Sequence, residues 1–122
     1  MALWKQHSDR GLNSLLSQIL ILTIMPVYVV NSYNIHDFEM FKNYPPQVRP
    51  LFAKYGAKVI AMDTNAKALE GVPKTMNAVI EFPSEDAVNQ FYNDAAYQSI
   101  IHFRLNSTSD STIVILKQFE AK

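Results

Sequence analysis

Two side chains late in the sequence have the types and the spacing to bind an anion. Tyr97 and Arg104 are seven residues apart, so two helical turns would place them on nearly the same face. A phenol and a guanidinium that converge can hold a carboxylate or stabilise an enolate. The alternative is structural, with Arg104 pairing with the Glu81 carboxylate or capping a backbone carbonyl. The sequence leaves both interpretations open.

Polar residues interrupt two predicted strands that are otherwise apolar. They are Asn31 and Tyr33 on the first strand, and Asn77 and Glu81 on the third. Even spacing places each pair on one face of its strand. A buried amide or carboxylate needs hydrogen-bond partners, which a ligand, a dimer interface or water at a sheet edge would supply. The candidate ligand-binding residues are Tyr33, Asn77, Tyr97 and Arg104.

His36 and His102 are the histidines outside the first 24 residues, and neither belongs to a metal-ligand spacing. His36 precedes Asp37 at a predicted helix cap, and a surface or capping role explains it. We expect no metal and no cofactor. His102 remains a candidate proton relay, and a single helical histidine over a sheet would also suffice to bind haem or activate oxygen. The candidate catalytic residues are Arg104, Tyr97 and His102.

Composition excludes several classes of protein. The 122 residues are 48% hydrophobic and 18% charged, with 11 basic and 11 acidic side chains, which excludes a disordered chain and indicates one domain. Zero net charge argues against nucleic-acid binding. The absence of cysteine excludes disulfides, thiolate metal sites and a cysteine nucleophile. Three glycines exclude a glycine-rich phosphate loop, so composition names no reaction.

Residues 1–24 differ from the rest of the chain. Lys5 and Arg10 precede an apolar run, as in a signal peptide, but no A-x-A cleavage site follows. The run is too short and too interrupted for a transmembrane helix, so we expect no membrane insertion. We predict an N-terminal extension at 1–24, with Met25 as the natural start of one domain at 25–122. That predicts a cytoplasmic protein, and an exported one if residues 1–24 act as a signal.

The elements that must position these residues follow from hydrophobic period and helix caps. Strands are predicted at 26–34, 57–63, 75–82 and 112–119. Helices are predicted to start at Asp37, Pro46, Ser84 and Asp94, and Gly56 to end the second. The segments 64–74 and 106–111 are predicted as polar connections. Two of these helices lie between the first and second strands, and two lie between the third and fourth. Counting each pair as one helical segment, the order is β-α-β-β-α-β. It predicts an α+β ferredoxin-like fold, with a four-stranded antiparallel sheet and both helical segments on one face.

The predicted strands are apolar on both faces, although two helices can cover only one of them. A bare apolar face is rare on a soluble monomer, so we predict a homodimer through the sheet faces. The alternative is that the apolar segment 15–24 folds back over the second face.

Several motifs together resemble one bacterial protein family. They are YVVNSYNI at 28–35, FKNYPPQVRPLFAKYGAKVIA at 41–61, LEG at 69–71 and VIEFPSEDAVNQFYNDAAYQSIIHFRLNS at 79–107. The chain resembles a family catalogued as a domain of unknown function in the dimeric α+β barrel superfamily. The resemblance implies a dimer whose sheets face one another, but no reaction. The superfamily includes cofactor-free oxygenases, isomerases, haem-degrading enzymes and stress-responsive binding proteins, so fold analogy leaves the function open.

Two hypotheses for function follow. The first is a small organic ligand bound between sheet and helices, with cofactor-free oxygenase or isomerase chemistry if the protein is an enzyme. The second is a non-catalytic dimeric binding or stress-associated protein. An open aromatic cavity beneath Arg104 would favour the first, and a closed core with Arg104 paired to a carboxylate would favour the second.

Overall fold

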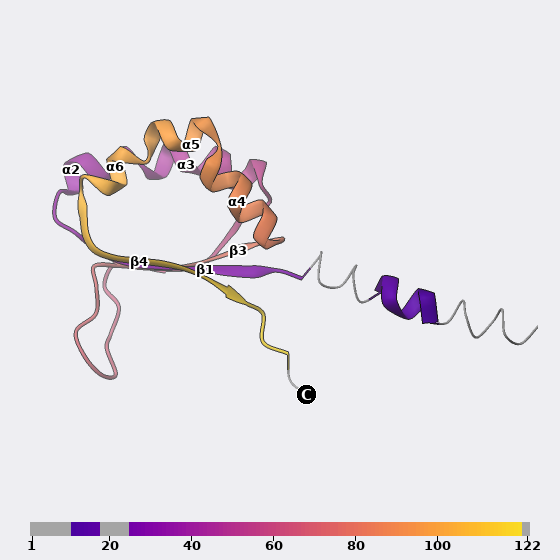
Figure 1. Cartoon of the computed structure of the whole chain (residues 1–122). Helices are drawn as coiled ribbons and strands as arrows, with labels where there is room; N and C mark the ends of the chain where they lie inside the picture. The colour runs from indigo at the N-terminus through magenta and orange to yellow at the C-terminus, as the bar shows by residue number, and fades with distance from the viewer. Residues whose placement is uncertain (1–10, 18–24, 121–122) are drawn as a thin grey trace, which may run out of the picture.

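Four antiparallel strands form one sheet in the order β2-β3-β1-β4. The strands are β1 (Val27–Ile35), β2 (Lys58–Asp63), β3 (Met76–Phe82) and β4 (Thr108–Lys117). The helices are α2 (Phe38–Phe41), α3 (Pro45–Lys54), α4 (Glu85–Asn93), α5 (Ala95–Ile100) and α6 (His102–Leu105). These five helices pack on one face of the sheet (Figure 1). This arrangement confirms the predicted ferredoxin-like α+β fold.

The structure is a computed structural model that describes residues 11–17 and 25–120. Residues 11–17 are helical and exposed. The predicted extension at 1–24, its role as a signal and its alternative role in covering the sheet therefore fall mostly outside the described residues. Among the described residues, no helix combines the length and the apolar character needed to cross a membrane.

The predicted side-chain caps are present at the starts of α2, α4 and α5, whereas α3 starts at Pro45 without a side-chain cap. Asp37 Oδ1 accepts a hydrogen bond from the Met40 amide, and Ser84 Oγ accepts one from the Ala87 amide. These side chains satisfy amides that the first helical turn leaves free. Gly56, which follows α3, has φ +71, and a Cβ there would lie 3.3 Å from Pro83 Cγ. Glycine is therefore required at this turn both for its backbone angle and for space.

The last strand starts earlier than predicted. Residues 108–111, expected in a polar turn, belong to β4, and Thr108 and Ser109 pair with the end of β1 opposite Ile35 and Asn34. The register shifts between Ser32 and Asn34, and Asp110 has φ 54, a conformation that aspartate tolerates better than most residues. The prediction of a turn was wrong because pairing with β1 outweighs the low strand propensity of Ser and Asp.

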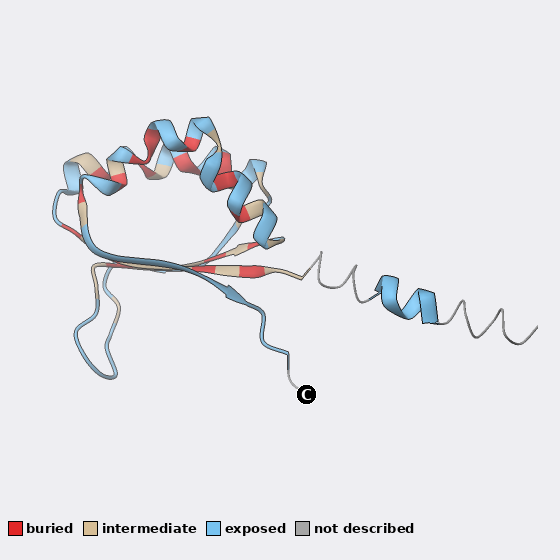
Figure 2. Cartoon of the chain, viewed as in Figure 1, coloured by how far each residue is buried: buried red, intermediate tan, exposed pale blue. Residues whose placement is uncertain are grey.

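The sheet has one covered face and one open face. On the covered face, the apolar core residues of the central strands are Val27, Val29, Tyr33, Ile35, Met76, Ala78, Ile80 and Phe82. The intervening residues face the other way, with Tyr28 opposite Glu81, Val30 opposite Val79 and Ser32 opposite Asn77. Along β4 every residue after Thr108 is exposed (Figure 2), including Val114 (48%) and Leu116 (51%). The open face is therefore mixed: Val30, Val79, Val114 and Leu116 are apolar but lie among polar residues, so the prediction of two apolar faces holds only in part.

Asp94 joins the start of α5 to the end of α3. Its Oδ1 accepts from the Ala96 amide and caps α5, while its Oδ2 accepts from Tyr55 Oη (2.5 Å) and Lys54 Nζ (2.9 Å) at the end of α3. The hydrogen bond from Tyr55, followed by that from Lys54, lowers the pKa of the Asp94 carboxyl from 3.8 to about 2. The start of the helix that carries Tyr97 is thereby held against α3.

The Asp94 contacts predict a pH-dependent loss of stability. A folded-state pKa below the unfolded value stabilises the protein above about pH 3.8, and this contribution is lost as the pH falls toward about 2. Asp94→Asn keeps a capping side chain but loses the charge. We expect the variant to be less stable than the wild type at pH 6, with the difference shrinking between pH 4 and pH 2. Urea unfolding at each pH measures this, and a difference independent of pH would contradict it.

Candidate functional site

A cavity of about 380 Å³ lies between the sheet and the helix layer. Its wall residues come from three strands and from α3 to α6: Val29, Asn31, Tyr44, Phe52, Ile80, Phe82, Val88, Asn89, Phe91, Tyr92, Asn93, Tyr97, Arg104, Leu105, Ser111, Ile113 and Ile115. The volume falls in the lower part of the range of about 300–1,000 Å³ that small-molecule sites occupy.

Arg104 is the charged group of this cavity. It lies on α6 and is only 3% exposed. Its Nη2 donates to Tyr97 Oη at 3.4 Å, its guanidinium lies 5.9 Å from the centre of the Tyr44 ring, and its Nε is buried without a partner. Burial opposes the charged form, yet the neighbouring Tyr97 and Tyr44 leave the pKa of Arg104 above its ordinary value. The guanidinium is therefore a charged donor at neutral pH.

No carboxylate neutralises Arg104 in the part of the chain that the structure describes. The ion pairs found there are Lys42–Glu39 and Lys54–Asp94. Glu81 lies on the open face of the sheet, where its carboxylate accepts from Tyr28 Oη. Since Arg104 lines the cavity on the covered face, the predicted alternative of an Arg104–Glu81 pair does not form.

Two tyrosines lie beside Arg104. The hydroxyls of Tyr44 and Tyr97 are 2.7 Å apart, and burial, followed by the proximity of Tyr97, raises the pKa of Tyr44. Tyr44 is therefore protonated at neutral pH. The predicted pairing of Tyr97 with Arg104 on one helical face is present, although Ile101 separates them as the cap between α5 and α6.

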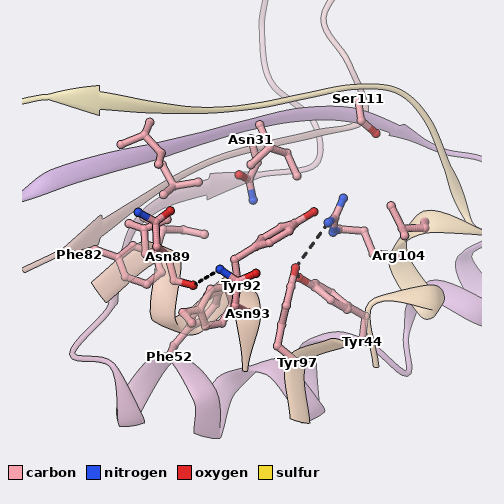
Figure 3. A pocket seen from close by; sticks show the side chains of 17 residues that line it. Asn31, Tyr44, Phe52, Phe82, Asn89, Tyr92, Asn93, Tyr97, Arg104 and Ser111 are labelled. Atoms are coloured by element: carbon pink, nitrogen blue, oxygen red, sulfur yellow. Dashed lines mark hydrogen bonds between the residues drawn. The ribbon is translucent and has the colours of Figure 1, made fainter. Parts of the chain in front are cut away.

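Asn31 supplies a further polar group from the floor of the cavity. Its Oδ1 is buried without a hydrogen-bond partner. The side chains of Asn31, Tyr97 and Arg104 point toward the same part of the cavity (Figure 3). Asn31 is two residues from Tyr33, which already indicated that both lie on the same face of β1, but Asn31 was left out of the predicted ligand-binding set. Tyr44 was also missed, because nothing in the sequence brings it to Tyr97, 53 residues later.

The predicted site residues do not all meet. Tyr33 is buried beneath the helices but does not line the cavity; its ring packs on Phe41, and burial raises its pKa to about 12. Asn77 is on the open face, where its Nδ2 donates to the Lys74 carbonyl and its Oδ1 accepts from Ser32 Oγ. His102 is exposed, lies against Phe103 and is outside the cavity wall.

Arg104 lies at one end of the cavity, and the phenylalanines lie toward the other end, where Asn89 is beside Phe82 (Figure 3). Phe52 and Phe82 lie away from Tyr97 and Arg104 (Figure 3), and Phe91 stacks on Phe52 with ring centres 5.2 Å apart. The wall contains no Asp, Glu or His, and the described residues hold no cluster of three such groups that would bind a metal ion. The arrangement is therefore able to hold an anion against an apolar body, but offers no carboxylate or imidazole as a general base.

Comparisons place the fold among known proteins. Residues 26–119 match the model of a domain of unknown function, DUF1330. None of the curated proteins compared with the chain matches it. The crystal structure of RPA0582, a protein of unknown function from Rhodopseudomonas palustris, is 19% identical with a TM-score of 0.71, covering 88% of this chain and 94% of that one.

Two further solved structures share the fold at lower identity. A dimeric protein of unknown function with a ferredoxin-like fold from Bacteroides fragilis is 11% identical, with a TM-score of 0.55 over 76% of this chain and 96% of that one. SnoaB, a cofactor-independent oxygenase from Streptomyces nogalater, is 10% identical, with a TM-score of 0.60 over 80% and 96%. At these identities the likeness shows the fold alone.

The isolation of Arg104 predicts an unusual tolerance to substitution. Arg104→Met keeps much of the side-chain volume and removes a buried charge without stranding a carboxylate, so the free energy of unfolding should fall by less than about 1.5 kcal/mol, because relief of the unpaired charge offsets the contacts that are lost. Phe82→Ala, at a core position 1% exposed, should lose about 3–5 kcal/mol. Urea unfolding compares the two. A loss from Arg104→Met as large as that from Phe82→Ala would mean that the guanidinium is a structural ion.

Proposed function

The chain belongs to the DUF1330 domain family, and from its site we propose that it binds a small organic acid in the cavity between sheet and helices. The observation that carries this proposal is the buried guanidinium of Arg104, with an unpaired Nε and no carboxylate partner among the described residues. Removing a charge from water without pairing it destabilises a protein by several kcal/mol. A ligand carboxylate, phenolate or enolate would offset that penalty.

The rest of the cavity supports a ligand with an apolar body. The acidic head would meet Arg104, Tyr97 and Asn31, and a ring or branched chain would lie toward Phe52, Phe82 and Phe91. Several wall residues are themselves exposed, among them Asn89, Tyr92 and Ile113 (38%), which gives a route from solvent between α4 and β4. A mostly apolar pocket with a few convergent polar groups is typical of small-molecule sites.

Cofactor-free oxidation is the second candidate function. The Tyr44–Tyr97–Arg104 arrangement favours it, because it would stabilise an enolate or phenolate by charge and hydrogen bonds. The wall holds no ordinary base, so the substrate must be acidic enough to arrive ionised. Its anionic carbon would form a C–O bond with O₂, passing two electrons to the oxygen, and a proton from solvent through Tyr97 would complete a hydroperoxide. The exposed His102 is poorly placed for that relay.

We further propose that the protein is a homodimer whose open sheet faces pack together. Val30, Val79, Val114 and Leu116 make the open face partly apolar. Structural neighbours from Bacteroides fragilis and Thermobifida fusca are described as dimeric. A second copy would remove the open face from water, in the self-complementary manner of a two-fold interface.

The anion proposal predicts selective binding of acids. Benzoate and phenylacetate should raise the melting temperature and bind in calorimetry, whereas their neutral amides should not. Arg104→Met should weaken acid binding roughly 10- to 100-fold, as expected for losing hydrogen bonds to a charged group. His102→Ala is the matched control and should bind normally. Equal binding of acids and amides, or of wild type and Arg104→Met, would reject the proposal.

The pH dependence of that binding has a defined direction. Because Arg104 has a raised pKa and stays charged, affinity should be constant near neutral pH and fall as the acid itself protonates, around pH 4. Calorimetry between pH 4 and pH 8 measures this. A loss of binding as pH rises from 6 to 8 would show that another group controls the site.

The dimer proposal predicts the mass in solution. Light scattering of the full chain should give twice the mass of one chain at micromolar concentration, and residues 25–122 alone should give the same assembly. Val114→Asp on the open face should weaken the dimer. A stable monomer of the full chain would reject the proposal, and aggregation of residues 25–122 alone would instead indicate that residues 1–24 cover the open face.

A further inference from the structure

The connection between β2 and β3, residues 64–75, is long for two neighbouring antiparallel strands, whose loops commonly have about 2–5 residues. We call it the arm. It extends from the sheet on the side away from the helices, which is the side of the open face (Figure 1). Its turn contains Gly71 with φ +80, which favours glycine.

The arm presents apolar side chains to water. Leu69 is 103% exposed and Val72 is 92% exposed, the highest values among the large apolar residues that the structure describes. Long loops without secondary structure are usually polar, or functional. Nothing in the described chain covers these two side chains, which makes them candidates for contact with a second molecule.

The base of the arm is held by side chains at the ends of the strands. Asp63 Oδ1 accepts from the Asn65 amide at 2.7 Å, Asn34 Oδ1 accepts from the Thr75 amide at 3.2 Å, and Asn77 Nδ2 donates to the Lys74 carbonyl at 2.9 Å. Both ends of the arm are thereby directed out of the sheet. This gives Asn77, a predicted ligand-binding residue, a positioning role on the opposite side of the sheet from the cavity.

The open face alone is small for a stable interface. Four strands about 4.8 Å apart and about eight residues long on average give a flat footprint of roughly 500 Å². Stable interfaces commonly bury about 800 Å² on each partner. Two arms, one from each copy, would supply much of the missing area, because a two-fold axis places each arm beside the other copy.

Charge on the open face also fits a second copy. Lys58 of β2 lies opposite Glu81 of β3, and neither takes part in an ion pair among the described residues. A surface that carries both signs is able to pair with itself across a two-fold axis. A partner of one strong charge would not match it.

We propose that the arm of each copy crosses the dimer interface and packs Leu69 and Val72 against the open sheet face of its partner, near Val114 and Leu116. This inference rests on the proposed sheet-to-sheet dimer, and it adds the element that makes that dimer stable. The arm is then an interaction element, separate from the ligand cavity on the other face.

Substitution at the tip of the arm tests this in the full chain. Leu69→Asp combined with Val72→Asp should raise the dimer dissociation constant at least about 100-fold in sedimentation velocity. Phe38→Asp is the matched control: it replaces an exposed apolar residue (57%) on α2, in the helix layer, and should leave the dimer unchanged. If the wild type is a dimer and the double variant dissociates no more readily, the proposed role of the arm is overturned and the proposed dimer stands. If the wild type is a monomer, both proposals are overturned.

A single label supplies a second measurement, because the chain has no cysteine. Leu69→Cys carrying an environment-sensitive fluorophore should emit at shorter wavelength in the dimer and shift to longer wavelength when dilution separates the copies. Phe38→Cys carrying the same fluorophore should show no shift. A label at position 69 that stays in water in the dimer would overturn the proposal. A label that stays buried after dissociation would also overturn it, because the arm would then pack on its own chain, such as residues 1–24.

Discussion

Successive side chains of a β-strand point to opposite faces of the sheet. This alternation gives the sheet a covered face, which carries the core and the cavity, and an open face. On β1 it sends Val29, Asn31 and Tyr33 toward the helices, and Val30 and Ser32 toward the open face. The helix layer then has only one face to cover. The core and the cavity lie under it, and everything on the other face is left for water or for another molecule. No shift of one residue in register would preserve both surfaces.

The cavity combines an apolar wall with an isolated cation. Arg104 donates to Tyr97, which lies 2.7 Å from Tyr44 through the two hydroxyls, and all three are buried. The tyrosine hydroxyl accepts one hydrogen bond from the guanidinium but does not neutralise its charge. An anionic ligand would supply both the remaining acceptors and the opposite charge. The lack of Asp, Glu and His in the wall limits the chemistry: the site is suited to holding an anion, and a reaction would depend on a substrate that ionises readily.

The site also depends on the helix caps. Asp94 caps α5 and accepts hydrogen bonds from Tyr55 and Lys54 at the end of α3. Tyr97 follows Asp94 by three residues. The carboxylate that holds the two helices together therefore also fixes the position of the Tyr97 side chain in the cavity. At the other end, the Arg104 carbonyl accepts from Ser107 Oγ and Thr108 Oγ1, which fixes the turn from α6 into β4. The same hydrogen bonds therefore stabilise the fold and position Tyr97 and Arg104 in the site.

Local chemistry made much of the fold predictable. Asp37, Ser84 and Asp94 cap helices as their side chains indicate, Gly56 takes the left-handed angle that ends α3, and the apolar pattern of the strands indicates apolar residues on both faces. Spacing along one helical segment was also enough to bring Tyr97 to Arg104. These features depend on neighbours within a few residues, so the sequence by itself determined them. Pairings across long separations were decided only by the tertiary structure: Tyr44 with Tyr97, Thr108 and Ser109 with β1, and Asn34 with Thr75 at the base of the arm. The physical reason is that period fixes which residues of one strand share a face, but only the pairing of strands and the position of the helices decide which of its two faces is buried.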